Sequence, residues 1–211
     1  MKRIRVLLAD DHRIFLAGLR MLLETDFDVV GAVEDGRALL VEASRLKPDV
    51  IVADVSMPSL NGIEAVQQIR ASGLKAKILF LTMHGDALFV REALRSGASG
   101  YVLKRDAPDK LVAAIRQVAD GKSYVGPELL RDAMMLSGND SEQQRLGKLT
   151  ARQREVLQLV AEGRSLKEIA SAIHVSIKTA EFHKYNLMER LGVRSNAELT
   201  TIAIRHGLVS I

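Results

Sequence analysis

Five polar side chains in the first half of the chain each close or follow a short apolar run: Asp10, Asp11, Asp54, Thr82 and Lys104. Short runs of this kind are typical of strands in a parallel sheet. The carboxyl ends of parallel strands lie at one edge of the sheet, where such folds bind their ligands. We therefore expect these five side chains to converge on one site.

Three carboxylates at one site repel one another. Each like-charged pair costs roughly 3 kcal/mol at a separation of ~5 Å and an effective dielectric constant near ~20. A divalent cation offsets this cost, and Mg²⁺ prefers oxygen ligands. We expect Asp11, Asp54 and the backbone carbonyl of Ser56 to bind Mg²⁺ directly, and Asp10 to bind it through water.

Asp54 is the best candidate for a nucleophile. An aspartate that accepts a phosphoryl group divides the transfer into two easier steps. Lys104 and Mg²⁺ would neutralise charge on the transferring group. Taken alone, the Asp10–Asp11 pair is better explained as a helix cap, Lys104 as a solvated side chain and Tyr101 as a core residue. Together, the residues favour reversible aspartyl phosphorylation.

The first 121 residues alternate short β-branched runs with amphipathic stretches. The expected strands are residues 4–9, 28–32, 50–53, 78–82 and 100–103. The expected helices are residues 13–24, 37–46, 63–70, 87–96 and 108–120. Five such units predict a doubly wound α/β domain, a five-stranded parallel sheet with helices on both faces.

Residues 122–148 break this alternation and are interpreted as a linker. Pro127 suits the first turn of a short helix, residues 127–136. The stretch that follows, from Ser137 to Ser141, is polar and contains glycine, which is typical of a flexible tether. We place the domain boundary within residues 137–148.

From residue 149 onward the pattern is helical, and we expect four helices at 151–162, 166–173, 177–191 and 196–207. Thr150, Ser165 and Ser195 each have Gln or Glu three residues later, which is the pattern of a capping box. Only three residues join the second and third helices. This spacing predicts a helix-turn-helix, a motif that reads DNA.

The helix expected at 177–191 has an outward face suited to double-stranded DNA. We expect Glu181, Phe182 and Tyr185 to contact base edges, because glutamate accepts hydrogen bonds from cytosine and aromatic rings contact the thymine methyl group. His183 is expected to pack in the core. The residues expected to contact phosphates are Lys178, Thr179, Lys184, Arg164, Lys167 and Arg194.

Composition sets wider limits. The 211 residues are 47% hydrophobic and 27% charged, which is ordinary for a folded protein of one or two domains. There is no cysteine, and no apolar run approaches the ~20 residues of a membrane span. We expect a cytoplasmic protein with no membrane partner. Residues 149–211 hold 9 Lys/Arg and 6 Asp/Glu, so the basic part of the chain is the expected DNA reader.

Residues 1–121 resemble the receiver domain of two-component response regulators. The matching stretches are Leu8-Ala9-Asp10-Asp11-His12, Asp54-Val55-Ser56-Met57-Pro58 with Asn61-Gly62, Leu81-Thr82-Met83-His84 and Tyr101-Val102-Leu103-Lys104. The resemblance implies a flavodoxin-like fold and phosphorylation of Asp54 by a sensor histidine kinase. It also implies that Thr82 moves to the phosphoryl group and Tyr101 rotates inward. The sequence departs from the family at Arg105, where proline is common. We further expect Ser56 and His84 to modulate the lifetime of the phosphate.

Residues 149–211 resemble the LuxR-type helix-turn-helix domain. The resemblance lies in residues 149–157, 161–163, 167–170, 176–183 and 191–193, with Ala180 where valine is usual. The whole chain thus resembles the NarL/FixJ class of response regulators. This resemblance implies a regulator that forms a homodimer when phosphorylated, with RNA polymerase as a further candidate partner.

Two alternatives belong to other classes. One is a phosphatase or phosphotransferase that uses the same aspartates on small substrates, but no Asp-x-Asp nucleophile motif, phosphate-binding Gly-rich loop or substrate lid is visible in the sequence. The other is a DNA-binding regulator controlled by a partner protein instead of phosphorylation. The intact Asp, Thr and Lys set argues against it. We expect no enzymatic turnover beyond self-catalysed phosphoryl transfer at Asp54.

Overall fold

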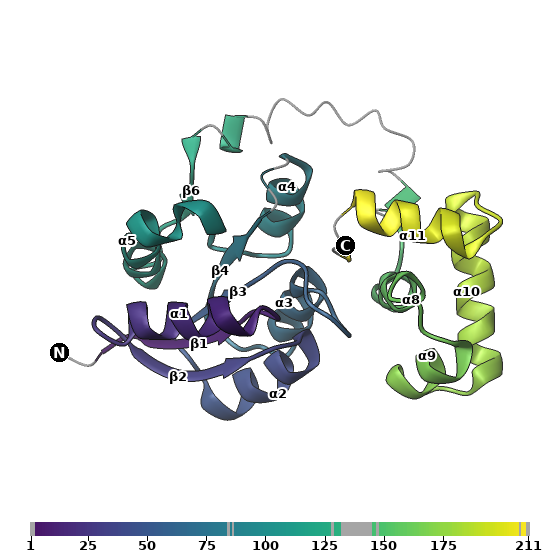
Figure 1. The fold of residues 1–211 in the computed structure, drawn as a ribbon, viewed down its shortest axis with the longest axis horizontal. Coiled ribbons are helices and arrows are strands. Elements are labelled where there is room, and N and C mark those ends of the chain that lie inside the picture. Colours follow the sequence, from purple (N-terminus) through teal and green to yellow (C-terminus); the bar gives the residue numbers. More distant parts are fainter. Residues whose placement is uncertain are drawn as a thin grey trace. The chain divides into compact units, whose positions relative to one another are not determined.

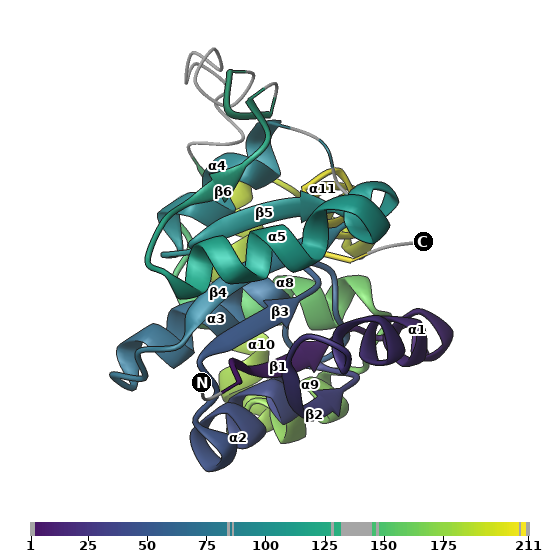
Figure 2. The same ribbon diagram turned by 90° about the vertical axis from the view of Figure 1, so that its left-hand side faces the viewer.

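The computed structural model divides the chain into two compact units, residues 1–136 and 137–211. The residues that it describes are 3–83, 85, 87–127, 129–131, 145–146, 148–206 and 208–209. Most elements of the two units are labelled in Figure 1, and β5 is labelled in Figure 2.

The first unit is built on a parallel sheet with the order β2-β1-β3-β4-β5-β6 (Figure 1). The order reverses between β1 and β3, which is the topological switch point of a doubly wound sheet. The strands are β1 (Arg5–Ala9), β2 (Asp28–Val33), β3 (Val50–Ala53), β4 (Lys77–Thr82), β5 (Gly100–Leu103) and β6 (Tyr124–Val125). The predicted α/β class is therefore confirmed.

The predicted number of five strands is wrong, because β6 adds a sixth at the edge beside β5. Tyr124 and Val125 pair with Gly100 and Tyr101, and the Tyr124 amide donates to the carbonyl of Ser99 at 3.0 Å. A strand of two residues is too short to show an alternating pattern. Its pairing is set by the neighbouring strand, and the sequence alone assigned these residues to the linker.

Helices cover both faces of the sheet. Helices α1 and α5 pack on one face with Val6, Leu8 and Leu79, and α2, α3 and α4 pack on the other with Leu7 and Ile51. Figure 2 shows α5 lying along the sheet. The helices are α1 (Arg13–Leu23), α2 (Gly36–Leu46), α3 (Gly62–Ala71), α4 (Ala87–Arg95) and α5 (Ala107–Ala119). A short 3₁₀ helix, η1 (Lys104–Asp106), precedes α5 and was not predicted.

The second unit consists of α8 (Ala151–Ala161), α9 (Leu166–Ala172), α10 (Ile177–Leu191) and α11 (Asn196–Arg205). Their buried side chains form one core, which includes Val156, Leu187 and Leu199. The predicted capping boxes at Thr150 and Ser165 are confirmed.

At the start of α11, Ser195 accepts a hydrogen bond from the Glu198 amide, but the Glu198 carboxylate accepts from the amide of Arg194. The third box is thus displaced by one residue from the predicted arrangement. Gly192, with φ of 73°, ends α10 in a left-handed cap, a conformation that favours glycine.

The linker lies only partly in the described part of the chain. Of the short helix predicted at 127–136, residues 127 and 129–131 are helical, and the others lie outside the described residues. The predicted tether, residues 137–141, also lies outside the described residues. None of the helices described is both long and apolar enough to cross a membrane.

Candidate functional site

The candidate acidic residues lie where β1 and β3 end, on adjacent strands at the switch point of the sheet. Sheet-type hydrogen bonds continue past both strands: the Asp10 amide donates to the carbonyl of Val33 at 3.0 Å, and the Asp54 amide donates to the carbonyl of Ala9 at 2.8 Å. These two bonds fix the backbone of both aspartates relative to the sheet. The position of each aspartate directly after its strand therefore places the two carboxylates close together.

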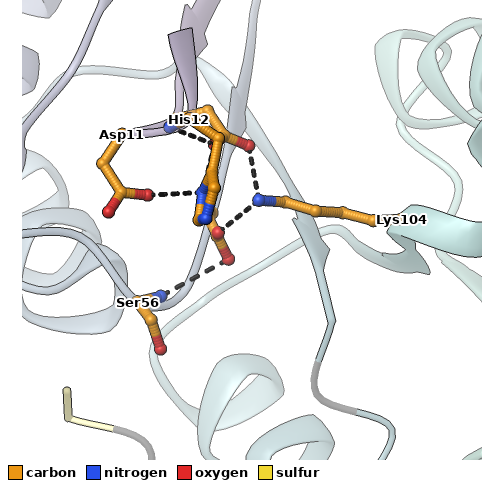
Figure 3. Close-up of polar contacts among 6 residues, drawn as sticks. Asp11, His12, Ser56 and Lys104 are labelled. Carbon is orange, nitrogen blue, oxygen red and sulfur yellow. Dashed lines mark hydrogen bonds and ion pairs between the residues drawn. The ribbon is translucent and has the colours of Figure 1, made fainter. Parts of the chain in front are cut away.

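Lys104 joins this pair from the end of β5. Its Nζ lies 2.6 Å from Asp54 Oδ2 and 2.8 Å from Asp10 Oδ2 (Figure 3). All three residues are buried, with exposed fractions of 8%, 4% and 2% for Lys104, Asp54 and Asp10. Desolvation opposes the burial of charged groups, so buried ion pairs of this kind are stable only when the groups lie close together.

Thr82, at the end of β4, is also fully buried, and its hydroxyl donates to the Asp54 carboxylate. Burial raises the pKa of the Asp54 carboxyl, and the Lys104 ammonium and the Thr82 hydroxyl only partly counteract this. Burial by itself would lower the pKa of Lys104, but attraction to Asp54 and hydrogen bonds to both aspartates raise it. Both shifts show that the pocket favours additional positive charge.

Asp10 and Asp11 differ in the partners of their carboxylate oxygens. Both oxygens of Asp10 have partners, since Oδ1 accepts from the His12 amide at 2.9 Å and Oδ2 contacts Lys104. Asp11 Oδ1 is buried and has no hydrogen bond, although the Nδ1 of His12 lies 2.9 Å away as a potential ion-pair partner. A buried carboxylate oxygen that lacks a hydrogen bond thus belongs to a residue expected to bind Mg²⁺ directly.

The donor set fits a divalent cation. Asp10, Asp11, His12 and Asp54 each offer a ligand atom, and these atoms lie within 4.8 Å of one another. One lysine does not balance three carboxylates, and carboxylate oxygens are the ligands that Mg²⁺ prefers. Asp11 and Asp54 would hold the ion, with Asp10, both of whose oxygens already have partners, as the outer residue.

The loop after β3 is held tightly against Asp54. The Ser56 amide lies 3.4 Å from Asp54 Oδ1, and Ser56 is buried. The Gly62 amide donates to the carbonyl of Val55 at 2.7 Å, and a Cβ on Gly62 would lie only 2.0 Å from the Asp54 carbonyl oxygen. Only glycine fits there. The use of the Ser56 carbonyl as a metal ligand stays a prediction.

Tyr101 and His84 complete the residues predicted around this pocket. Tyr101 is 1% exposed, and its ring centroid lies 6.5 Å from that of Phe80, so it occupies the inward orientation in this structure. His84 lies outside the described residues.

The sequence pattern did not single out two neighbours of the pocket. The His12 ring nitrogen lies 3.2 Å from Asp10 as well as close to Asp11, and the Lys104 ammonium lies 4.9 Å from the centre of the Phe15 ring. His12 follows the aspartates directly, and this adjacency was a usable signal. Phe15 resembled an ordinary core residue, and only the fold brings it to Lys104.

Helix α10 presents a second candidate surface. Phe182 and Tyr185 are 61% and 67% exposed, which is unusual for aromatic rings without a partner. Ile177, at the first helical position, is 51% exposed beside them and was not predicted as a reader. Among the expected contact residues Lys184 is half-buried; the exposed ones are Lys178, Thr179, Glu181, Arg164, Lys167 and Arg194.

Three details modify the expectations for this motif. The Thr179 hydroxyl lies 2.8 Å from that of Ser176, so it already contributes to the cap of α10. His183 is only half-buried, with its ring centroid 6.2 Å from that of Phe182, so the expected core position is wrong. His174, in the turn between α9 and α10, has φ of 55°, a left-handed conformation that favours glycine.

Comparison with known proteins identifies the family of each part of the chain. Residues 6–116 match the response regulator receiver domain family, and residues 147–203 match the luxR family of bacterial regulatory proteins. The chain belongs to the two-component response regulators of the NarL/FixJ class, which are transcription regulators with a LuxR-type DNA-binding domain.

Particular relatives extend over nearly the whole chain. It is 36% identical to the transcriptional regulatory protein MctR of Rhizobium johnstonii, over 99% of this chain and 96% of the relative. It is 35% identical to the oxygen regulatory protein NreC of Staphylococcus aureus, over 98% of this chain and 99% of the relative. Among solved structures, the RcsB response regulator of Salmonella typhimurium is 32% identical, with a TM-score of 0.65 over 95% of this chain and 96% of that one.

Proposed function

We propose that this protein is a DNA-binding transcription regulator switched by phosphorylation of Asp54. The observation that carries the proposal is the buried cluster in which Lys104 lies 2.6 Å from Asp54, with Thr82 donating to the same carboxylate. An aspartate with a cation and a hydroxyl beside it can accept a phosphoryl group. The same groups can then hold the product.

The proposed transfer is an in-line displacement at phosphorus. A carboxylate oxygen of Asp54 forms a bond to phosphorus, and the bond between phosphorus and the donor breaks, with the electron pair leaving on the donor. The donor is a phosphohistidine of a sensor kinase or a small acyl phosphate. Lys104 neutralises charge on the phosphoryl oxygens. Mg²⁺ bound by Asp11 and Asp54 would supply further neutralisation and orientation.

The product places close to two negative charges beside Thr82 and Lys104. Its added oxygens accept hydrogen bonds from both residues. Thr82 lies one strand from Tyr101, because Phe80 of β4 pairs with Tyr101 of β5. We propose that the inward orientation of Tyr101 is stabilised when Thr82 is held by the phosphoryl group.

The output of the switch is proposed to be promoter binding by a dimer. A two-fold dimer places two α10 helices about one turn of DNA apart. RcsB, a relative, has been solved as two dimers bound to two parallel DNAs, with 31% identity and a TM-score of 0.60. DNA as the ligand also supports the cytoplasm as the place of action. A kinase and RNA polymerase are the partners that this role requires.

The phosphorylation step is tested by incubating the full-length chain with Mg²⁺ and acetyl phosphate and measuring its intact mass. We expect the mass to increase by one phosphoryl group. Neither protein treated with EDTA before the incubation nor the Asp54→Asn variant should show this increase. Asp49→Asn is a control, because Asp49 precedes β3 at the other end of that strand. A gain that persists in Asp54→Asn would place the acceptor elsewhere.

DNA reading is tested with sites selected from a random duplex pool. Lys178→Ala should weaken binding to every duplex and flatten the dependence of affinity on salt, because it removes a phosphate contact. Phe182→Ala should cost about 1–3 kcal/mol at the preferred bases and less elsewhere. Binding curves at several salt concentrations separate the two effects. An equal loss on all duplexes for Phe182→Ala would remove it from the readers.

A further inference from the structure

His12 directly follows the two aspartates of the acidic pocket and stands at the N-cap of α1. Its side chain does not make the cap hydrogen bond that usually explains a polar residue at this position. The ring instead lies beside the Asp11 carboxylate, as Figure 3 shows, although the side chain is 61% exposed. A ring that has access to water but faces carboxylates needs another explanation.

The distances around the ring suit a metal ligand. The Nδ1 atom of His12 lies 2.9 Å from Asp11 Oδ1, yet Asp11 Oδ1 accepts no hydrogen bond. Two such atoms are arranged as neighbouring ligands of a third atom. Ligands at right angles around an octahedral ion are about 3 Å apart when each bond is about 2.1 Å long. The separation of Nδ1 and Oδ1 matches that value.

The other ligand atoms of the pocket lie at a compatible spacing. Among the residues that the structure describes, Asp10, Asp11, His12 and Asp54 are the only group of three or more His, Asp or Glu side chains spaced to hold a metal ion. Opposite ligands of an octahedral ion are about 4.2 Å apart, so a small contraction brings atoms that lie within 4.8 Å onto one ion. Both oxygens of Asp10 already have donors, which leaves His12, Asp11 and Asp54 as the direct ligands.

We propose that His12 is a nitrogen ligand of the divalent cation in this pocket, and that it favours transition ions such as Co²⁺ and Zn²⁺. Imidazole suits these ions, whereas Mg²⁺ prefers oxygen ligands and keeps several of its waters. A transition ion therefore gains a bond to His12 that Mg²⁺ does not gain. When Mg²⁺ is bound, water takes the position of the ring.

The protonation of His12 is compatible with this bond. A neutral imidazole binds a metal through one nitrogen and keeps its proton on the other. With Nδ1 on the ion the proton lies on Nε2, and the exposure of the side chain gives that nitrogen access to water. Asp10 Oδ1 then loses its 3.2 Å contact with the ring, but it keeps the His12 amide as a donor at 2.9 Å.

The consequence for the switch rests on the proposed function. An ion held by His12, Asp11 and Asp54 excludes Mg²⁺, because it occupies the same carboxylate oxygens. Zn²⁺ usually takes four ligands, so three protein ligands leave it one open position, fewer than Mg²⁺ keeps. Phosphorylation of Asp54 should therefore depend on which ion is present, and Zn²⁺ should slow it.

Ion binding is tested by calorimetry with Co²⁺ and with Mg²⁺ on the full-length chain, without a histidine tag and without a phosphodonor. His12→Asn keeps a favourable helix cap and should lower the affinity for Co²⁺ roughly tenfold or more. Its affinity for Mg²⁺ should change by less than about twofold, because the oxygen ligands remain. His183→Gln, in the second unit, is the matched control and should bind both ions as wild type does.

A second measurement reports the bond itself. When ¹⁵N-labelled protein is titrated with Zn²⁺, the Nδ1 signal of one imidazole should shift strongly, and His12→Asn should lack this shift. Equal Co²⁺ affinity of wild type and His12→Asn would overturn the inference. So would an equal loss of Co²⁺ and Mg²⁺ affinity, since His12 would then only position the aspartates. A loss of Co²⁺ affinity in His183→Gln would place the nitrogen ligand in the second unit.

The effect on the switch has its own readout. With Mg²⁺ and acetyl phosphate present, Zn²⁺ should suppress the mass increase of wild type at a concentration roughly tenfold lower than that needed for His12→Asn. Equal inhibition of the two proteins would show that His12 has no part in the switch. If Mg²⁺ alone produces no mass increase, the proposed phosphorylation is wrong, whereas the calorimetry still decides whether His12 binds the ion.

Discussion

In the receiver unit the candidate residues are withdrawn from water, with Asp54 4% and Lys104 8% exposed, whereas on α10 Phe182 is 61% and Tyr185 67% exposed. The first site is proposed to accept a small phosphoryl group, and a low dielectric there strengthens each electrostatic contact. The second is proposed to reach into a groove of DNA. Because buried charges affect folding and exposed side chains hardly do, we expect the same kind of substitution to have different consequences in the two units.

The sharpest contrast is between two lysines. Lys104→Met leaves Asp10 and Asp54 without their shared cation, and breaking a buried pair of this kind costs about 3 kcal/mol or more. Lys178→Met removes an exposed charge and should change stability by less than about 0.5 kcal/mol. Urea unfolding followed by hydrogen exchange reports the two units separately. If both variants lose a similar free energy of unfolding, the expected difference between the two units is wrong.

Metal addition should stabilise only the receiver unit. A ligand at about a hundred times its dissociation constant stabilises a folded protein by about 2.7 kcal/mol. Calorimetry with and without Mg²⁺ should show this gain in one transition and none in the other. In Asp11→Asn the gain should shrink strongly, because Asp11 carries a buried carboxylate oxygen that has no hydrogen bond. The matched variant Asp109→Asn, on α5, should retain the full gain.

The pH dependence of stability should also separate the units. Burial raises the pKa of Asp54, so the folded state binds its proton more readily than the unfolded state does. The stability that this group contributes is therefore fully present below its ordinary pKa of ~3.9 and is lost as pH rises through the folded-state pKa. In EDTA, wild type should lose stability relative to Asp54→Asn from about pH 4 upward. If the urea midpoints of wild type and Asp54→Asn change with pH in the same way, this prediction is wrong.

The smallest effect is expected in the second unit, at the turn between α9 and α10. His174 has φ of 55°, where a side chain costs about 1–2 kcal/mol and glycine does not. His174→Gly should therefore be more stable than His174→Ala by about 1 kcal/mol, the reverse of their order in a helix. Thermal unfolding of the two variants measures the difference. A more stable alanine variant would show that the turn relaxes.

Elements with strong local signals were predictable from the sequence. Helix α10 has the predicted bounds because Ser176 caps its start and Gly192 its end. Strands β3 and β5 also have the predicted bounds. The convergence of Asp10, Asp54, Thr82 and Lys104 followed from the rule that parallel strands end at one edge, and the distances agree with it.

Features that depend on neighbours were not predictable. Strand β6 exists because β5 offers it an edge, and the contact of Phe15 with Lys104 arises only when α1 packs on its face of the sheet. Ile14 and Met21 of α1 are 92% and 76% exposed, which had no sequence signal, because an apolar helix pattern does not say which of its sides the sheet will cover. His183 failed for a related reason: helical spacing assigned it to the core side, yet it is half-buried beside Phe182.

The pairing of β6 with β5 has a mechanical consequence. Val125 is in register with Tyr101, so the segment leaving the receiver unit is fastened to the very strand that carries the aromatic side chain. Tyr101 and residues 123–127 are among the residues that line a common hollow of about 250 Å³. A displacement of the Tyr101 side chain would therefore shift β6. The position at which the chain leaves the receiver unit would change with it.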